Sequence, residues 1–155
     1  ADAAAKITAL TANSTVAEIE AAKAAYDALA LKSKLNFNDE LYAKLVNAVN
    51  GVNKIKADAV KALKLTTKSS AKKGSITVKW TVKGDASAAD GYQVWKSTKQ
   101  SKGYKKAITT TKKSYKNTKG LKKGTRYYYK VRAYKVVDGK NVYSDWSNKA
   151  YRVAK

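Results

Sequence analysis

The stretch that decides the fold is residues 121–134, which read Leu121-Lys122-Lys123-Gly124-Thr125-Arg126-Tyr127-Tyr128-Tyr129-Lys130-Val131-Arg132-Ala133-Tyr134. A glycine-containing turn signal opens it, and aromatic and β-branched residues alternate after the turn. Glycine is favoured where a turn needs a positive φ, and a period of two is typical of a strand with one buried face. The stretch therefore predicts a tight corner that leads into a central β-strand.

The rest of residues 64–155 shows the same period of two. Residues 75–82 alternate so that Ile76, Val78 and Trp80 share one face. Further strands are expected at residues 63–67, 91–96, 104–110, 114–118 and 148–153, with turn signals between them. Short strands at this spacing, with no helical pattern among them, predict an antiparallel β-sandwich of the immunoglobulin-like kind.

Residues 1–63 repeat their apolar positions at helical spacing instead, and three helices fit the pattern. The second begins at Thr15, where Thr15 and Glu18 have the spacing of a capping box, and the third begins at Asn38. Gly51 inside the third helix costs about 1 kcal/mol relative to Ala, which predicts a break or a close helix crossing there. We expect two domains: a three-helix bundle at residues 1–63 and the sandwich at residues 64–155.

The positive charge belongs to the second domain. Residues 1–63 hold eight Lys against seven acidic side chains, whereas residues 64–155 hold 25 Lys or Arg against four Asp. Such a surface attracts polyanions without specificity, and the alternative is that the lysines are solvated side chains that protect strand edges. No helix-in-groove or aromatic RNA-binding pattern is present, so specific nucleic-acid binding is not expected.

The sequence argues against an enzyme, because it contains neither His nor Cys. Asp85 and Asp138 adjoin glycines, where Asp is favoured because its side chain bonds its own backbone. We therefore expect no catalytic residue, no metal site and no cofactor. Apolar runs are much shorter than the roughly 20 residues that span a bilayer, so no transmembrane segment is expected. Because the chain opens at Ala1-Asp2 and contains no Met, we expect a piece of a longer protein, monomeric as a fragment.

Several short motifs of residues 64–155 resemble those of fibronectin type III domains. Leu121-x-x-Gly124-Thr125-x-Tyr127 is similar to the corner before their sixth strand, and Ser144-Asp145-Trp146-Ser147 is similar to the Ser-x-Trp-Ser before their last strand. Lys123 stands where the family usually has Pro, which leaves the turn less rigid. The resemblance implies a structural core that contains Trp80, Tyr92, Val94, Leu121, Tyr127 and Trp146.

The lysine-rich strands resemble the variant of this domain found in secreted proteins of Firmicutes. Residues 21–29 are similar to helices of small Ala-rich modules that recur in Gram-positive surface proteins. These resemblances imply an extracellular, cell-wall-associated location. The implied role is a non-catalytic structural and adhesion module that presents or spaces other domains, with a protein, a glycan or anionic wall polymers at the cell surface as partner.

An outward aromatic and basic face is the candidate ligand site. If Tyr127 and Tyr92 point inward, alternation within each strand sends the residue after each of them, and every second residue from there, outward. The candidate residues are Trp95, Tyr128, Tyr134, Gln93, Lys130 and Arg132. Aromatic rings beside hydrogen-bond donors suit glycan or protein recognition, whereas the alternative is a cross-strand ladder in which Lys and Arg cover the rings. Two alternative functions therefore stay open: a carbohydrate-binding accessory module of a secreted polysaccharide-active enzyme, and nonspecific polyanion binding.

Overall fold

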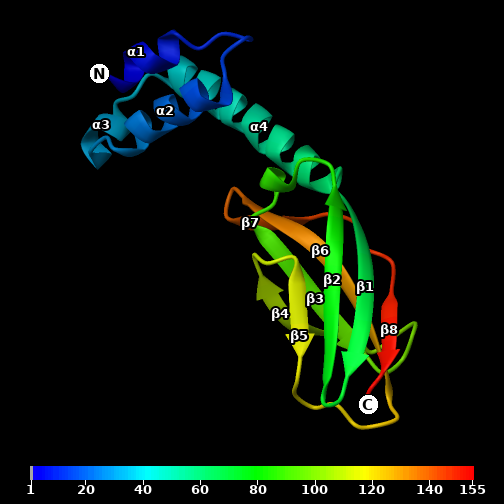
Figure 1. The fold of residues 1–155 in the computed structure, drawn as a ribbon. Coiled ribbons are helices and arrows are strands. Elements are labelled where there is room, and N and C mark those ends of the chain that lie inside the picture. The colour runs from blue at the N-terminus through cyan, green and yellow to red at the C-terminus, as the bar shows by residue number, and fades with distance from the viewer. Residues whose placement is uncertain (1) are drawn as a thin grey trace. The chain divides into compact units, whose positions relative to one another are not determined.

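The computed structural model describes residues 2–155, except for the side chains of Lys32 and Leu35. The chain divides into two compact units, Ala1–Ile55 and Lys56–Lys155 (Figure 1). The division therefore lies inside the last helix, whereas the change of periodicity had suggested residue 63. Val60 and Leu63 belong to the buried core of the second unit, which explains why this end of the helix groups with the strands.

The first unit is helical, as predicted. The expected helices are α1 (Ala3–Thr8), α2 (Val16–Asp27) and α4 (Asp39–Lys61), and a short α3 (Leu31–Leu35) was not predicted. The capping box is present, because the Thr15 hydroxyl accepts from the Glu18 N–H at 3.3 Å and the Glu18 carboxylate accepts from the Thr15 N–H at 2.7 Å. The buried core cluster of this unit consists of Ile7, Leu10, Ile19, Ala22, Leu45 and Val52.

Gly51 neither breaks α4 nor meets another helix. The helix continues through it, and a Cβ placed there would find no atom within 4 Å. The expectation of a break or close crossing was therefore wrong. Its basis was helix propensity, and a single unfavourable residue does not end a helix of 23 residues.

The second unit is an antiparallel β-sandwich, which confirms the predicted fold class. One sheet has the order β1 (Lys64–Lys72), β2 (Ser75–Lys83), β5 (Ser114–Asn117). The other has the order β4 (Lys105–Thr110), β3 (Gly91–Ser97), β6 (Arg126–Val137), β7 (Lys140–Tyr143), and β8 (Ala150–Val153) also pairs with β6. A short 3-10 helix, η1 (Ala86–Ala88), joins β2 to β3, so the chain crosses there from the three-stranded sheet to the other sheet (Figure 1).

The core lies between the two sheets. Trp80, Tyr92, Val94 and Tyr127 are all buried in it, and the Trp80 and Tyr92 rings meet edge to face with centroids 5.6 Å apart. Tyr129 is fully buried and its hydroxyl accepts from Asn117 Nδ2 at 2.9 Å. The alternation read from residues 75–82 and 127–133 thus places the same side chains inward in the structure.

The corner before β6 is built by Tyr127, as the resemblance implied. The Tyr127 hydroxyl donates to the Gly120 carbonyl at 3.0 Å and accepts from the Lys122 N–H at 2.9 Å. Gly124 has φ +80°, a conformation that side-chain-bearing residues rarely adopt. Leu121 is half-buried and packs against the core from this turn.

Trp146 differs from the expectation. It is only half-buried and lies outside the core cluster, with its ring against Trp95 on the outer side of the five-stranded sheet. Residues 144–149 form no regular strand, so the period-two rule does not fix the direction of their side chains. A core position for Trp146 is therefore corrected to a position on the outer face.

Candidate functional site

The candidate site is the outer face of the five-stranded sheet, where β3 and β6 lie side by side. Register pairs Gln93 with Arg132 and Trp95 with Lys130 across these strands. All four side chains point away from Val94 and Val131, which are fully buried. The structure therefore brings four of the six predicted face residues into one cluster.

Arg132 is the centre of that cluster. Its guanidinium carbon lies 3.5 Å from the ring centroid of Tyr143, 4.5 Å from that of Trp146 and 5.9 Å from that of Trp95. Its Nε and Nη2 both donate to Gln93 Oε1, at 3.1 and 3.0 Å. Gln93 is 8% exposed, so it serves as a buried acceptor rather than as a surface donor. Burial lowers the pKa of Arg132.

Lys130 extends the cluster along β6. Its Nζ lies 4.0 Å from the ring centroid of Trp146 and 4.6 Å from that of Tyr104. Burial lowers the pKa of Lys130, and the nearby charges of Lys149 and Arg132 lower it further. Rings and cations thus alternate in the order Tyr143, Arg132, Trp146, Lys130, Tyr104, which we call the cation–aromatic ladder.

Trp95 packs on the side of this ladder. Its ring meets Trp146 edge to face, with centroids 5.7 Å apart. Its Nε1 atom is buried and has no hydrogen-bond partner among the described residues. The indole therefore contributes packing area, while the group that could donate to a ligand is covered.

Tyr128 and Tyr134, the remaining predicted face residues, flank the ladder residues Lys130 and Arg132 on β6. Tyr128 pairs with Tyr151 of β8, with ring centroids 5.6 Å apart. Tyr134 covers Gly91, where an added Cβ would lie 3.0 Å from Tyr134 Cε1. Tyr134 also pairs in register with Tyr143, so both tyrosines adjoin the cation–aromatic ladder without being rings of it.

Three members of the ladder were not among the predicted ligand residues: Tyr104, Tyr143 and Trp146. For Trp146, the sequence signal that could have placed it is the spacing of Ser144 and Ser147, which lie on either side of it. Both serine hydroxyls accept from backbone N–H groups of β6, Ser144 from Ala133 at 2.9 Å and Ser147 from Val131 at 3.0 Å. Two serines fixed on one strand hold the intervening Trp146 beside the outward residues of that strand.

The same serine segment also joins the two sheets. Thr67 of β1 donates from its hydroxyl to Ser147 Oγ at 2.6 Å. The Thr67 N–H donates to Asn148 Oδ1 at 2.7 Å, and Asn148 Nδ2 donates to the Thr67 carbonyl at 2.9 Å. Residues 144–148, which we call the serine clip, therefore bond β1 of one sheet and β6 of the other.

Comparison with known families agrees with this geometry. The sequence model described as the fibronectin type III domain matches residues 58–149. The chain belongs to the fibronectin type III family. Domains of this family are typically non-catalytic and are often structural or spacer modules of multidomain proteins. No curated protein matches this fibronectin type III sequence.

Solved structures similar to this fibronectin type III chain come from bacterial and human proteins. A β-1,2-glucanase from Parabacteroides distasonis is 22% identical, with a TM-score of 0.49, over 61% of this chain and 13% of that one. An Fn3-like protein from Clostridium thermocellum is 26% identical, with a TM-score of 0.46, over 62% of this chain and 95% of that one. The pectate lyase Pel3 from Pectobacterium carotovorum is 17% identical, with a TM-score of 0.47, over 58% of this chain and 26% of that one.

Three carboxylates of the fibronectin type III unit, those of Asp85, Asp90 and Asp145, hold local structure. Asp85 accepts from the Ser87 N–H at 2.9 Å, and this bonding with Ser87 lowers its pKa. Asp90 accepts from the Val136 N–H at 2.8 Å and from Lys135 at 2.9 Å, which also lowers its pKa. Asp145 pairs with Lys64 at 2.7 Å. Within residues 2–155, no group of three or more acidic side chains has the arrangement of a metal site.

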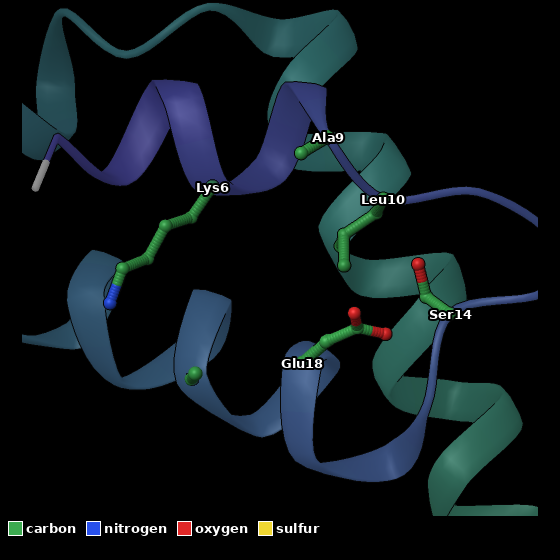
Figure 2. A pocket seen from close by; sticks show the side chains of 6 residues that line it. Lys6, Ala9, Leu10, Ser14 and Glu18 are labelled. Carbon is green, nitrogen blue, oxygen red and sulfur yellow. The ribbon is translucent and has the colours of Figure 1, made fainter.

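Outside the fibronectin type III unit, a hollow of about 260 Å³ lies between α1 and α2. Figure 2 shows Lys6 extending from α1 toward α2, with Leu10 and Glu18 at the other end. The Glu18 carboxylate already accepts from the Thr15 hydroxyl at 3.0 Å, and Ser14 Oγ accepts from the Thr11 N–H at 2.9 Å. The polar groups of Glu18 and Ser14 in this hollow therefore serve helix capping and the turn before α2.

The described part of the chain, residues 2–155, has no helix that is both long and apolar enough to cross a membrane. The longest, α4, carries charged side chains in both its N-terminal and its C-terminal part.

Proposed function

We propose that this chain is a non-catalytic structural and adhesion module of an exported bacterial cell-surface protein, where it presents or spaces other domains. The observation that carries the proposal is the cation–aromatic ladder. The rings of Trp146 and Tyr143, which lie beside the predicted face residues, are covered by the chain's own Lys130 and Arg132.

The ladder favours a structural role over glycan recognition. A sugar that stacks on an indole needs an open ring face and a nearby hydrogen-bond donor. Lys130 lies 4.0 Å and Arg132 lies 4.5 Å from the Trp146 centroid, and Nε and Nη2 of Arg132 both donate to Gln93. Binding a glycan there would have to displace a partly buried cation from its ring, so the alternative of an accessory carbohydrate-binding module is disfavoured.

The serine clip supports a spacer role for the same domain. A spacer must keep its two ends in place when the domains it connects are pulled apart. The clip bonds Thr67 near the start of the sandwich to residues just before β8, its last strand. Further along, the Ser69 hydroxyl donates to the Tyr151 carbonyl at 3.0 Å. The first and last strands are therefore tied directly to each other.

The proposed location is the outside of a Gram-positive cell. The resemblance of the lysine-rich strands and of residues 21–29 to secreted and surface proteins of Firmicutes supports it. Protease treatment of intact source cells tests the location, because an exposed module should release peptides from residues 56–155. Release only after the cells are lysed would contradict the proposal.

Retention on immobilised host and plant polysaccharides distinguishes the structural module from a glycan-binding accessory. We expect the full chain not to be retained at physiological salt, and Trp95→Ala to change only its stability. Retention of the wild-type chain that is lost in Trp95→Ala, with Tyr151→Ala as the matched exposed-aromatic control, would overturn the structural assignment. Tyr151 is 49% exposed, so its removal samples a ring that is open to solvent.

A further inference from the structure

The outer side of the three-stranded sheet has an unusual composition. Its outward positions are the alternate residues 64 to 72 of β1, 75 to 83 of β2, and residues 114 and 116 of β5. Each of these is Lys, Ser or Thr, and most are exposed. We call this surface the lysine face. It lies on the opposite side of the sandwich from the cation–aromatic ladder and shares no residue with it.

Lysines stand directly opposite each other on this face. Lys68 pairs in register with Lys79, and Lys64 pairs with Lys83. Like charges directly opposite on antiparallel strands destabilise a sheet. Lys64 is compensated by Asp145 at 2.7 Å, whereas no described carboxylate lies within ion-pair distance of Lys68 or Lys79. An anion from outside the chain would relieve this repulsion.

A hollow lies at that uncompensated pair. It has a volume of about 270 Å³ and is lined by Thr66, Lys68, Lys79, Trp80, Thr81 and Lys113. Thr66 and Thr81 are themselves a cross-strand pair, next to Lys68 and Lys79. The Lys113 carbonyl accepts from the Trp80 N–H at 3.1 Å, which places a third lysine beside the other two. Three lysines and two threonines thus line one depression that no carboxylate lines.

The chemistry of the face selects among anions. Lysine acts as a compact point charge suited to phosphate, whereas planar bidentate recognition of carboxylates is a property of arginine, which is absent from the outward positions. Stacking on aromatic rings is what holds single-stranded nucleic acids, and the one aromatic residue at the hollow, Trp80, is only 4% exposed. A phosphate polymer without bases therefore fits best.

The shape of the face favours an extended polymer. Lys64, Lys68 and Lys72 recur every four residues along β1, so neighbouring lysines are roughly 13 Å apart. Hydroxyl-bearing residues lie between them. A chain of small polyols joined by phosphodiesters carries charge and hydroxyls in the same alternating order.

We propose that the lysine face binds a linear phosphodiester polymer of small polyols, seated over the hollow between Lys68, Lys79 and Lys113. This site is independent of the structural role proposed above, because a spacer can act with or without it. Loss of one in an experiment would leave the other standing.

Binding of fluorescent poly(glycerol phosphate) to the full chain tests the site. The double variant Lys68→Gln/Lys79→Gln removes the opposed pair, and Lys105→Gln/Lys106→Gln removes the same charge from exposed positions of β4 on the other sheet. We expect at least a tenfold loss of affinity for the first variant and less than a twofold loss for the second. Affinity of the wild type should fall steeply between about 50 and 200 mM salt, and more gently in the first variant.

Equal losses in the two double variants would overturn the proposal, since they would show attraction to net charge alone. Undetectable binding at about 50 mM salt would overturn it as well. So would tighter binding of polygalacturonate, heparin or single-stranded DNA than of poly(glycerol phosphate). Acetylation of lysines in the wild-type complex gives a readout that needs no variant: Lys68, Lys79 and Lys113 should be protected, and Lys105 and Lys106 should not.

Discussion

The contacts of Arg132 change the function that is inferred for the outer face of the five-stranded sheet. On sequence alone it stands in a strip of outward aromatic and basic residues that suits a ligand. In the structure its guanidinium lies over Tyr143 at 3.5 Å and donates twice to Gln93. A cation over a ring contributes about 0.5–1 kcal/mol when exposed and about 2 kcal/mol or more when desolvated. The partly buried ladder is therefore a source of stability.

Gly51 offers a direct test at the residue scale. It lies in the middle of α4 with open space where a Cβ would be, and its φ is not positive. Gly51→Ala should therefore stabilise the helical unit by about 1 kcal/mol, because alanine has the better helix propensity. Thermal unfolding followed by the helical circular dichroism signal measures this.

Gly124→Ala is the matched control for that experiment. Gly124 also has open space around it, but its φ is +80°. The same added methyl group should destabilise the sandwich by about 1 kcal/mol, because an alanine is strained at this positive φ. A Gly51→Ala variant that is less stable than the wild type would show that the glycine has a role we have not identified.

At the scale of elements, the serine clip has more influence than its length suggests. Five residues without regular secondary structure bond β1 and β6, which belong to different sheets. They also hold Trp146 against Lys130. The clip therefore couples inter-sheet bonding to the formation of the ladder.

Ser147→Ala tests the clip. The substitution removes the acceptor of the Val131 N–H and of the Thr67 hydroxyl, both of which are buried. Leaving buried donors unpaired costs about 1–3 kcal/mol. Urea unfolding should show a loss of this size, whereas Ser70→Ala, at an exposed position of β1, should change stability by less than about 0.5 kcal/mol. Equal effects of the two substitutions would contradict the account of the clip.

At the scale of the whole molecule, stability should depend on pH in the alkaline range. Burial raises the pKa of Tyr129 from 10.0 to about 12. Burial also raises the pKa of Tyr92, Tyr104 and Tyr115. Because the unfolded chain loses these protons first, stability is fully present below pH 10.0 and is lost as the pH rises toward about 12.

The Tyr129→Phe variant isolates the largest of these contributions. It should unfold more easily at neutral pH, since Asn117 Nδ2 loses its acceptor, but its stability should fall less steeply above pH 10.0. Urea unfolding at a series of pH values measures both slopes. Identical slopes for the two proteins would mean that the Tyr129 phenol ionises as readily in the folded state as in the unfolded one.

The sequence predicted the parts of the molecule that follow a simple period. Alternation placed Trp80 and Tyr127 inward, and helical spacing with a capping box located α2. It could not place Trp146, because residues 144–149 lack the period from which direction is inferred. It also missed α3 and β7, of five and four residues, which are too short to show a period. β7 is formed by the turn at Asp138 and Gly139, which pairs it with β6. Ring partners such as Tyr104 and Lys130 meet only through sheet register.

The most direct test of the central claim, that the outer-face rings are occupied by the chain's own cations, is a double-mutant cycle between Arg132 and Trp146. Urea unfolding would be measured for Arg132→Met, Trp146→Leu and the double variant. The loss of the Gln93 bonds occurs with and without Trp146 and so cancels in the cycle. A favourable coupling of between about 1 and 2 kcal/mol is predicted. A coupling near zero, together with retention on a polysaccharide that depends on Trp95, would contradict it.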